Sequence, residues 1–566
     1  MRTNSHVLRL ALSLILIVAI TIPAEAARAP KRSGPAFVDG QVLVGFQPGI
    51  PAAARSDAHR QAGGQVLKTL DAIGVDLVTI PPGTVDRSIA AYRSNPNVRF
   101  AEPNYVRVMI LPTEGHDPPP PFGTGIDYLK EQWGLNNTGQ SFYYDPWTGA
   151  IGAISGAVDA DIDAPEGWDL STGDAAVKIA ILDAGVDCLH VDLRSKCVEQ
   201  RLITSQSTTL DDVIGHGTHV AAIAAAETNN GKGTAGVGWN STFGSLKVCY
   251  EYDDPFLGTV GLCDTAASAS AMAYAADNGY KVINMSYAGP EFSQTEADAA
   301  KYAWDHGVVL VAAASNDYER TPTYPAAYPQ VMGVAATDWY DNLAGFSNFG
   351  NWVSIAAPGY YVFSALPNAA CGIPEDDPDG CYGWLSGTSM ASPHVAGAAA
   401  LVWAKLGSGA TPQQVRAAIE GGADRTGALG QNFLAWTQHG RLNVYGALSG
   451  ASPPPATSVH VGDLDGVGSA AQGGRWTATV TIVVHDDAHV PVSGITVTGA
   501  WSGGASGTNS CVTAAGGQCQ LAKQVQRNSP GATFSVTALS GATYASALNH
   551  DPDADSSGTT LTVAKP

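Results

Sequence analysis

The sequence carries little charge and few basic residues. Only 14% of its 566 residues are charged, and 51 acidic residues stand against 30 basic ones, giving a formal net charge of -21. After the N-terminal 32 residues there is no long basic run. Because binding to phosphate groups needs clustered Lys and Arg, this composition argues against nucleic acid as a partner. The acidic balance is consistent with solubility.

Long apolar runs are missing beyond the N-terminus. No later segment approaches the ~18 apolar residues of a membrane span. The leader has Arg2 and Arg9, an apolar stretch at 10–22 and a small-x-small cleavage pattern at 24–26. We expect residues 1–26 to be a signal peptide, and the mature chain to be extracellular without a membrane span. A membrane anchor is the alternative.

The C-x-x-C spacing of zinc sites is also absent. The chain has eight cysteines, an even number, which favours disulfides in a secreted protein. The cysteines form four close pairs along the sequence, and each pair flanks a loop-like stretch. We therefore expect the disulfides Cys188–Cys197, Cys249–Cys263, Cys371–Cys381 and Cys511–Cys519.

Hydrophobic residues make up 45% of the chain, enough to build cores, and its length favours two to four domains without internal repeats. Residues 37–108 predict a small α+β domain of ferredoxin-like order, β-α-β-β-α-β. Its strand-like runs are 42–46, 65–70, 75–80 and 98–101, and its helix-like runs are 52–62 and 85–94.

A linker or processing region at 109–127, with four consecutive prolines, separates this domain from an α/β pattern at 128–450. Short apolar runs there alternate with helix-like stretches, which predicts a doubly wound parallel sheet. The expected strands are 177–182, 244–248, 282–285, 308–314 and 331–336.

A second, Pro-rich linker at 451–456 precedes a stretch at 457–566 with no helical period. Alternating or β-branched runs at 476–484, 494–501 and 533–539 predict an all-β, Ig-like sandwich. This domain could bind a polymer, a cell surface or a substrate protein, or only add stability.

Two segments place candidate catalytic groups near the start of the α/β region. Asp183 ends an apolar strand, where a carboxylate can orient a histidine, although a strand-terminal Asp often only caps a turn. His216 lies between glycines at the start of an Ala-rich helix and can exchange a proton near neutral pH. A zinc site formed by His216 and His219 is the alternative. The zincin pattern has histidines at i and i+4 with a Glu after the first, whereas these two are at i and i+3 without a Glu.

The third segment, Ser-Gly-Thr-Ser-Met-Ala-Ser-Pro at 386–393, sets Ser389 at the start of an apolar helix. Free N–H groups and positive potential at a helix N-terminus suit a developing oxyanion. The alternative is that this serine is simply an N-cap.

Together the three segments, in the order Asp, His, Ser, resemble those of the subtilases, the subtilisin-like serine peptidases, over residues 132–448. The resemblance implies a subtilisin-like fold and a serine endopeptidase acting on proteins and peptides, with Asp183, His216 and Ser389 as its triad. Residues 37–104 are similar to the inhibitory propeptides of that family. This implies a self-processing precursor, inhibited intramolecularly by its own propeptide, and we expect a monomer.

The same resemblance assigns Asn316 as an oxyanion donor. It also implies that Ser286, Tyr287 and Ala288 line the substrate-binding edge. Ser315 and Ala288 stand where glycine is common in the family, and Thr323 stands where some relatives have glycine. These larger side chains predict a shallow S1 pocket and a preference for small or medium P1 residues over large aromatic ones.

A calcium site is implied by a loop at 227–234 that resembles the calcium loop of thermitase-like subtilases. Ca²⁺ prefers about 6–8 oxygen ligands. The alternative is a plain Asn-Gly turn. The expected ligands are the side chains of Asp192, Asn230 and Asp127 and the carbonyls of Glu227, Lys232 and Thr234.

Two other functions are weighed against this one. A sedolisin-type acid peptidase has a similar serine motif but uses Glu as its base, and the intact Gly-His-Gly-Thr-His at 215–219 argues against it. An inactive subtilase-like protein used for binding or adhesion would be expected to lack catalytic groups, whereas Asp183, His216, Ser389 and Asn316 are all competent side chains.

Overall fold

The computed structural model describes residues 34–109, 131–144, 152–255, 258–375, 377–451, 458–470, 475–486, 491–514, 516–540, 542–552 and 555–566. The predicted signal peptide and nearly all of both predicted linkers lie outside this described part. The chain divides into two compact units, one of Met1–Lys405 with Thr411–Ala451 and one of Leu406–Ala410 with Ser452–Pro566. No helix in the described ranges is long and apolar enough to cross a membrane.

The N-terminal part of the first unit has the ferredoxin-like arrangement predicted from the sequence. Its antiparallel sheet has the order β4-β1-β3-β2, and apolar residues of two helices pack on one face of that sheet. Its elements are β1 (Phe37–Phe46), α1 (Ala52–Ala62), β2 (Gln65–Leu70), η1 (Asp71–Ile73), β3 (Val75–Thr79), α2 (Val85–Arg93) and β4 (Val98–Met109).

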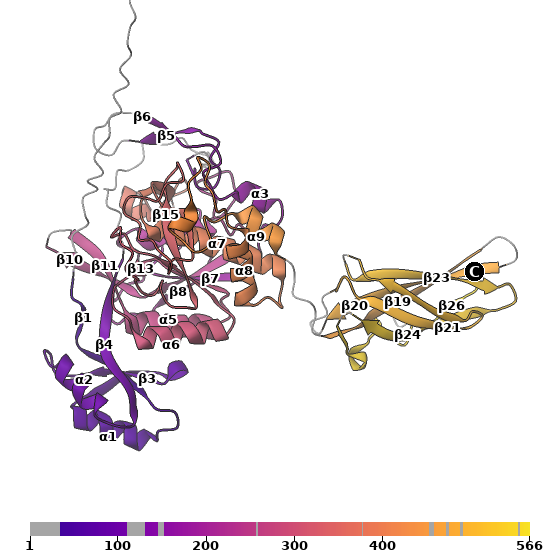
Figure 1. Ribbon diagram of the computed structural model, residues 1–566, viewed down its shortest axis with the longest axis horizontal. Helices are drawn as coiled ribbons and strands as arrows, with labels where there is room; N and C mark the ends of the chain where they lie inside the picture. Colours follow the sequence, from indigo (N-terminus) through magenta and orange to yellow (C-terminus); the bar gives the residue numbers. More distant parts are fainter. Residues whose placement is uncertain are drawn as a thin grey trace, which may run out of the picture. The chain divides into compact units, whose positions relative to one another are not determined.

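A seven-stranded, all-parallel sheet forms the centre of the first unit. The apolar runs predicted a parallel sheet and five of its strands, but not the two edge strands, Ile355–Pro358 and Cys197–Leu202. Most of its strands are fully buried because helices cover both faces (Figure 1). In spatial order its strands are β16 (Ile355–Pro358), β15 (Val331–Thr337), β14 (Val309–Ala313), β12 (Val282–Met285), β7 (Lys178–Asp183), β9 (Thr242–Lys247) and β8 (Cys197–Leu202).

Seven helices accompany this sheet in the described part of the chain. Figure 1 shows α5 and α6 side by side on the face nearer the ferredoxin-like part, whose sheet packs through Leu43 and Leu77 into the same apolar core as the alanines of both helices. The helices are α3 (Ala164–Trp168), α4 (His216–Ala225), α5 (Thr265–Asp277), α6 (Gln294–Asp305), α7 (Thr388–Leu406), α8 (Pro412–Gly422) and α9 (Val444–Gly450).

Smaller elements lie around the parallel sheet. The short strands are β5 (Ser141–Tyr144), β6 (Gly152–Ser155), β10 (Cys249–Asp254), β11 (Gly258–Asp264), β13 (Tyr287–Ala288), β17 (Val362–Leu366) and β18 (Cys381–Leu385), and the 3-10 turns are η3 (Asn368–Cys371) and η4 (Phe433–Ala435).

Strand β4 is much longer than expected. The sequence predicted a strand over 98–101, whereas β4 continues to Met109. Its second half leaves the ferredoxin-like sheet and pairs antiparallel with β11 and β13. Because those partners lie more than 150 residues away in sequence, local periodicity did not reveal them. This strand joins the N-terminal fold to the edge of the parallel-sheet fold.

The C-terminal unit has two four-stranded sheets around their own core, in agreement with the predicted all-β sandwich. The sheet orders are β23-β20-β19-β25 and β22-β21-β24-β26. Its elements are β19 (Ser458–Ala470), β20 (Arg475–Asp486), β21 (Thr496–Gly503), β22 (Gly507–Val512), β23 (Gln518–Gln526), β24 (Gly531–Ser540), β25 (Thr543–Tyr544), η5 (Ser546–Leu548) and β26 (Thr560–Ala564).

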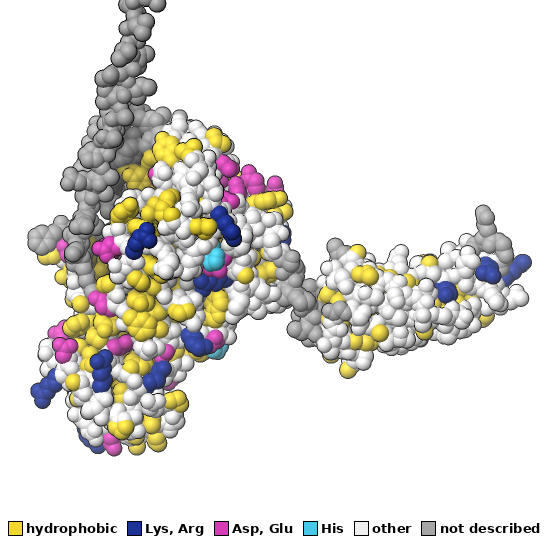
Figure 2. All heavy atoms as spheres, in the orientation of Figure 1, with side chains coloured by type: hydrophobic (Ala, Val, Ile, Leu, Met, Phe, Trp, Pro, Cys, Tyr) yellow, Lys and Arg dark blue, Asp and Glu magenta, His cyan; other side chains and the backbone are white. Residues whose placement is uncertain are grey.

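Basic side chains do not gather on the visible surface. Figure 2 shows the described Lys and Arg side chains of that face scattered over both units, without a continuous basic strip. This distribution agrees with the low basic content of the sequence.

Candidate active site

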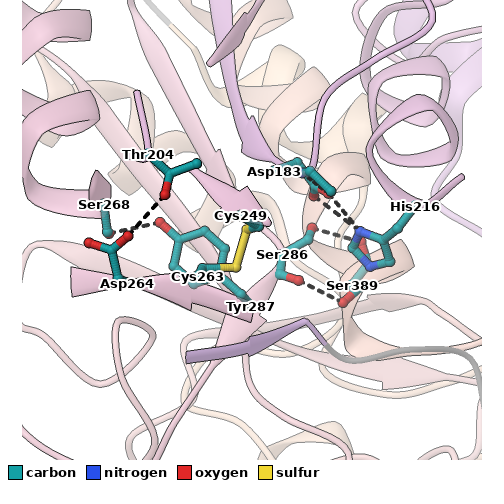
Figure 3. The surroundings of a disulfide bond; sticks show 11 residues. Asp183, Thr204, His216, Cys249, Cys263, Asp264, Ser268, Ser286, Tyr287 and Ser389 are labelled. Carbon is teal, nitrogen blue, oxygen red and sulfur yellow. Dashed lines mark hydrogen bonds and ion pairs between the residues drawn. A yellow bond between two sulfur atoms is a disulfide. The ribbon is translucent and has the colours of Figure 1, made fainter. Parts of the chain in front are cut away.

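Three elements bring the predicted catalytic residues together (Figure 3). Asp183 is the last residue of β7, at the carboxyl end of the parallel sheet, where sites form in open α/β folds. His216 is the first residue of α4, and Ser389 lies in the first turn of α7. All three residues are buried. A strand end and two helix starts therefore converge on one point.

Gly217 allows α4 to approach β7 closely. A Cβ atom at this position would lie 2.0 Å from the carbonyl oxygen of Gly185 and 3.1 Å from Oδ1 of Asp183. Any larger residue would push the helix, and His216 with it, away from the carboxylate. The glycine after the histidine is thus required by packing.

His216 and Asp183 form a buried pair. The Nδ1 atom of His216 lies 2.9 Å from Oδ1 and 3.1 Å from Oδ2 of Asp183. Burial acts to lower the pKa of His216, but the charge and hydrogen bond of Asp183, together with the charge of Asp212, raise this pKa above its ordinary value. The pair fixes the tautomer that leaves Nε2 to accept a proton, and it stabilises the imidazolium.

Asp212 supports the start of α4 and was not identified from the sequence. Its Oδ1 accepts from the backbone N–H of Gly215, and its Oδ2 accepts from both the N–H and the hydroxyl of Thr218. Burial raises the pKa of Asp212 to about 6. This carboxylate ties the turn before His216 to the first turn of its helix. An acidic residue shortly before a helix start was the available signal.

The Ser389 hydroxyl is turned away from His216. It donates to the carbonyl of Ser286 at 3.0 Å, and Nε2 of His216 is buried with no hydrogen-bond partner in the described residues. The hydroxyl of Ser286 in turn donates to the Ser389 carbonyl at 2.9 Å. Proton transfer from Ser389 to His216 therefore requires rotation about the Cα–Cβ bond of the serine.

Asn316 supplies a side-chain amide beside the serine. Its Oδ1 accepts from the N–H and the hydroxyl of Thr388, both at 3.0 Å, which fixes the amide plane. Its Nδ2 is buried and has no partner within the described ranges. Leaving a buried donor unsatisfied costs about 1–3 kcal/mol, so this amide is suited to an acceptor that arrives with the substrate.

Ser315 adopts a left-handed backbone conformation with φ of 90°. Side-chain-bearing residues rarely adopt this conformation, which explains why glycine is common at this position. Here the serine is held by its N–H, which donates to the Thr388 hydroxyl, and by its own hydroxyl, which donates to Asp317. The strained residue fixes the backbone that leads into Asn316.

The predicted substrate-edge residues form a short strand that is already paired. Tyr287 and Ala288 make up β13, which lies opposite Met109 and Val108 of β4. On its other side Val108 lies opposite Leu262 of β11. The end of β4 therefore lies between two strands in the manner of an extended peptide.

Thr323 lies near the end of this strand, because the next residue, Tyr324, pairs antiparallel with Gly289, which directly follows β13. Its buried hydroxyl donates to the carbonyl of Ala314 at 2.8 Å, so it is bonded to the backbone that follows β14. Its role in the S1 pocket remains a prediction.

Glu102 of β4 binds the start of α6 and was also missed from the sequence. Its carboxylate accepts from the N–H groups of Gln294 and Thr295 and from the hydroxyl of Ser293, each at 2.9 Å. A carboxylate at a helix N-terminus is favoured by the free N–H groups and the helix dipole. The contact fastens the N-terminal fold to the parallel-sheet fold.

The residues expected to bind calcium are grouped around Asp192. Asp192 is buried, and its oxygens accept from Asn230 Nδ2 at 3.0 Å, the Thr234 N–H at 2.7 Å and the Tyr382 hydroxyl at 3.0 Å. Burial raises the pKa of Asp192 to about 6. A Cβ on Gly233 would lie 1.9 Å from Oδ2 of Asp192, so the loop wraps tightly around the carboxylate.

This loop fits a hard cation. No described cation pairs with Asp192, and the hydroxyl oxygen of Thr234 is buried without a partner in the described residues. For its amide oxygen to bind the same ion as Asp192, Asn230 would have to turn its amide, giving up the bond that Nδ2 donates to Asp192 and the bond that Oδ1 accepts from the Lys232 N–H. Asp127, the other expected carboxylate, lies outside the described residues.

All eight cysteines are in disulfides, with the pairing expected from their proximity in sequence. Cys249 and Cys263 lie directly opposite each other in the β10–β11 hairpin, near Tyr287 (Figure 3). The bonds are Cys188–Cys197, Cys249–Cys263, Cys371–Cys381 and Cys511–Cys519.

Comparison with known proteins gives matches to both folds of the first unit. Residues 174–446 match the model of the subtilase family, and residues 23–104 match that of the fervidolysin N-terminal prodomain. The chain is 32% identical to the thermophilic serine proteinase of Bacillus sp. (strain AK1) over 415 residues, which is 73% of this chain and 88% of that protein.

Two further relatives are similar. Thermitase of Thermoactinomyces vulgaris is 39% identical over 287 residues, or 51% of this chain and 93% of thermitase. The crystal structure of fervidolysin from Fervidobacterium pennivorans superposes with a TM-score of 0.58 at 25% identity, covering 89% of this chain and 72% of that one.

Proposed function

The chain belongs to the subtilase family and is a serine endopeptidase with an N-terminal prodomain, and on this premise we propose that Asp183, His216, Ser389 and Asn316 carry the reaction. One observation carries the assignment: the buried His216–Asp183 pair lies with Ser389 at the carboxyl end of the sheet, beside Asn316, whose Nδ2 has no hydrogen-bond partner among the described residues. The family match supports neither a sedolisin-type mechanism nor an inactive binding protein.

In the proposed mechanism Ser389 rotates toward His216, and Nε2 takes its proton as Oγ attacks the scissile carbonyl. Asp183 holds the imidazole ring and stabilises the imidazolium. The Asn316 amide and the backbone N–H of Ser389 bind the oxyanion. His216 then protonates the leaving amine, and a water molecule hydrolyses the acyl-enzyme by the same steps in reverse order.

We further propose that this chain is made as a self-processing, secreted precursor. Strand β4 lies along β13 as a substrate would, and its end approaches the serine, which supports cleavage of the following segment by the chain's own triad. The proposed parts are the signal peptide (1–26), propeptide (37–108), processing region (109–127), catalytic domain (128–450), linker (451–456) and β-sandwich (457–566).

N-terminal sequencing and intact mass of the secreted protein test the activity and the processing together. We expect the wild-type chain to lose its leader and propeptide, and Ser389→Ala to retain the propeptide because its nucleophile is missing. Ser392→Ala is a matched control, since this serine is in the same helix and its hydroxyl contacts Ser286. An identical mature N-terminus in wild type and Ser389→Ala would contradict self-processing.

We propose that the Asp192 loop binds Ca²⁺, with Asp192, Asn230 and the loop carbonyls of Glu227, Lys232 and Thr234 as ligands and Asp127 as a further carboxylate. The ion would neutralise the buried carboxylate and hold the loop that follows α4. EDTA should lower the Tm of the Ser389→Ala protein, and added Ca²⁺ should restore it. In Asp192→Asn the Tm should no longer respond to either. An EDTA-insensitive Tm would contradict the site.

We also propose that the S1 pocket favours small or medium residues. The side chains of Ser315, Ala288 and Thr323 support this, because they replace glycines of the common pattern. A panel of peptides that differ only at P1 measures the preference as kcat/KM. Fastest cleavage after Phe or Tyr would contradict the proposal.

A further inference from the structure

Arg107 is a fully buried arginine near the end of β4. Its Nη2 donates to Oε2 of Glu296 at 2.8 Å and its Nε donates to the same oxygen at 3.3 Å. Its Nη1 lies 3.9 Å from a carboxylate oxygen of Glu291. Because charged side chains are almost never fully buried unless they are paired, this cavity must be built to receive a guanidinium group.

The walls of this cavity belong to the catalytic fold, not to the prodomain. Glu296 is in the first turn of α6, is fully buried, and accepts a hydrogen bond from the Tyr328 hydroxyl at 3.1 Å. A Cβ on Gly289 would lie 3.0 Å from Nη1 of Arg107, so this glycine leaves room for the side chain. In the described part of the chain Glu296 has no other cationic partner. When β4 leaves, Glu296 loses its counter-charge.

The pairing of β4 fixes where a substrate would meet this cavity. Met109 lies opposite Tyr287 and Val108 opposite Ala288 in an antiparallel register. In a peptide bound with the same register, the next residue lies opposite Ser286, whose carbonyl accepts the hydrogen bond of Ser389. That residue carries the scissile carbonyl, so the place of Arg107 is the fourth residue before the scissile bond, P4.

We propose that Glu296 forms the base of an acidic P4 pocket that selects substrates with arginine at this position. The inference rests on the proposed function and names a substrate class for the same site. An arginine at P4 restores the ion pair, whereas a neutral residue leaves the carboxylate without a counter-charge, with only the hydrogen bond from the Tyr328 hydroxyl. Losing one member of such a pair at an interface lowers affinity by about 100-fold. Lysine has one compact ammonium group and should be intermediate.

A peptide series that differs only at P4 tests the pocket on the mature enzyme. The residues compared are Arg, Lys, Ala, Glu and citrulline, which has nearly the shape of Arg without its charge. We expect kcat/KM for the Arg peptide to exceed that for the citrulline peptide by about 100-fold. In Glu296→Gln this ratio should fall to within about threefold of one, because the charge that selects Arg is gone.

Asp298→Asn is the matched control, since Asp298 is an acidic residue of the same helix that pairs with Arg99 of the prodomain. Its Arg-to-citrulline ratio should equal that of the wild type. If Glu296→Gln fails to mature, Arg107→Gln/Glu296→Gln keeps the buried contact neutral and supplies the same measurement. Cleavage of all peptides with an Arg-to-citrulline ratio near one overturns this inference alone, whereas no cleavage of any peptide contradicts the proposed function.

A separate observation in the C-terminal unit carries a second proposal. His460, His485 and His550 each place one ring nitrogen within 4.8 Å of the others. His460 and His485 are directly opposite on β19 and β20, and the N–H of His550 donates to the carbonyl of Val461. A Cβ on Gly462 would lie 2.3 Å from Nδ1 of His485, so this glycine makes space for the imidazole.

We infer that these three histidines bind a Zn²⁺ ion. Imidazole is a preferred ligand of Zn²⁺, with Zn–N distances of about 2.0–2.1 Å, and three His ligands leave a fourth position for water. Bonds of this length need the three nitrogens closer together than 4.8 Å, so the rings would turn toward the ion on binding. The ion would join the paired neighbouring strands β19 and β20 to the segment that follows η5.

Zinc titration of the full-length Ser389→Ala protein, stripped with EDTA, tests this site. We expect one more bound Zn²⁺ in the parent than in His485→Ala, with Co²⁺ giving a visible absorption band characteristic of tetrahedral coordination only when all three histidines are present. His306→Ala is the control, because this exposed histidine stacks on Tyr302 in the other unit. Equal zinc stoichiometry in the parent and in both His485→Ala and His460→Ala would overturn the proposal.

Discussion

At the scale of single residues, the candidate site holds buried polar atoms that, in the proposed mechanism, form hydrogen bonds only once a substrate is present. Nε2 of His216 and Nδ2 of Asn316 are both buried without a hydrogen-bond partner in the described part of the chain. Such atoms oppose folding, because water must be removed from them without compensation. Hydrogen bonds to Asp183 and Thr388 hold the two side chains in place. They are therefore already oriented when the reaction begins, and no reorganisation is needed at that step.

Asn316→Ala should therefore lower kcat and leave KM nearly unchanged, because the amide bonds to the oxyanion more than to the ground-state carbonyl. The loss known for the equivalent asparagine of a subtilisin, about 10²–10³ in kcat, sets the scale. Steady-state kinetics on one peptide measures both constants. The control is Asn342→Ala, at a surface position. Asn348→Ala would not serve, because Asn348 holds the loop that follows Asn316. A rise in KM alone would contradict the role.

Two buried histidines should make the catalytic fold sensitive to acid. Burial lowers the pKa of His190 and of His394 to about 4 in each case. Between pH ~6.5 and 4 the unfolded chain binds protons at these positions and the folded chain does not. The free energy of unfolding is therefore fully retained above pH ~6.5. It decreases as the pH falls toward 4, by about 3 kcal/mol for each of the two histidines.

Chemical unfolding of Ser389→Ala and of Ser389→Ala/His394→Asn as a function of pH checks this expectation. The free energies of unfolding of the two proteins should converge as the pH falls from 7 to 4. His306→Asn, at an exposed site, should leave the pH dependence unchanged. A constant difference between the two proteins over this range would show that His394 takes up its proton in the folded state as readily as in the unfolded one.

At the scale of elements, strand β4 shows why the sequence did not predict every strand in full. The strands and helices of the prodomain follow local periodicity, and their predicted limits agree with the structure to within one residue for α1, α2, β2 and β3. The second half of β4 is a strand only because β11 and β13 pair with it. For the same reason the sequence did not reveal Arg107 and Glu296, which are 189 residues apart.

The site was easier to predict where its residues lie in short motifs. Asp183, His216 and Ser389 each occur beside glycine or other small residues that allow close packing, and these neighbours are visible in the sequence. Asp212 and Glu102 act through backbone N–H groups of helix starts, and for Glu102 that helix start lies 193 residues further along the chain, so only Asp212 left a local signal in the sequence. Their roles became evident only when the helices were seen in place.

The contact of β4 with α6 gives a prediction for inhibition by the prodomain. Glu102→Gln should weaken the inhibition of the mature enzyme by added prodomain by about tenfold or more, because a charged acceptor at a helix N-terminus becomes neutral. The measurement is the inhibition constant of wild-type and variant prodomains. Asp86→Asn, on the exposed face of α2, should leave it unchanged. Equal constants for all three prodomains would remove Glu102 from the inhibitory contact.

At the scale of the whole molecule, the two compact units have separate cores. The core of the C-terminal unit is built from described residues between Val459 and Val563 of that unit, and the triad and Asn316 lie in the first unit. Composition and alternating patterns predicted an all-β fold after the α/β region, because the spacing of apolar residues changes between the two, but they did not predict that Leu406–Ala410 group with the second unit. They could not predict the function of the second unit.

A chain that ends at Ala451 should therefore fold and keep its peptidase activity. We expect kcat/KM on a short peptide within about twofold of the full chain, since domains with their own cores can fold alone. The Tm of the first unit should change little. A truncated protein that is made but inactive on the peptide would mean that the second unit is needed for the active conformation.

The Cys249–Cys263 disulfide at the substrate edge has a consequence for how binding is driven. It closes the β10–β11 hairpin across directly opposed residues, and Leu262 next to it pairs with the strand that occupies the cleft. A hairpin restrained in this way has little conformational entropy left to lose when a peptide joins it. Binding of the substrate main chain then requires little loss of conformational entropy from the enzyme. Unfolded substrates can therefore bind long enough for their side chains to enter the specificity pockets.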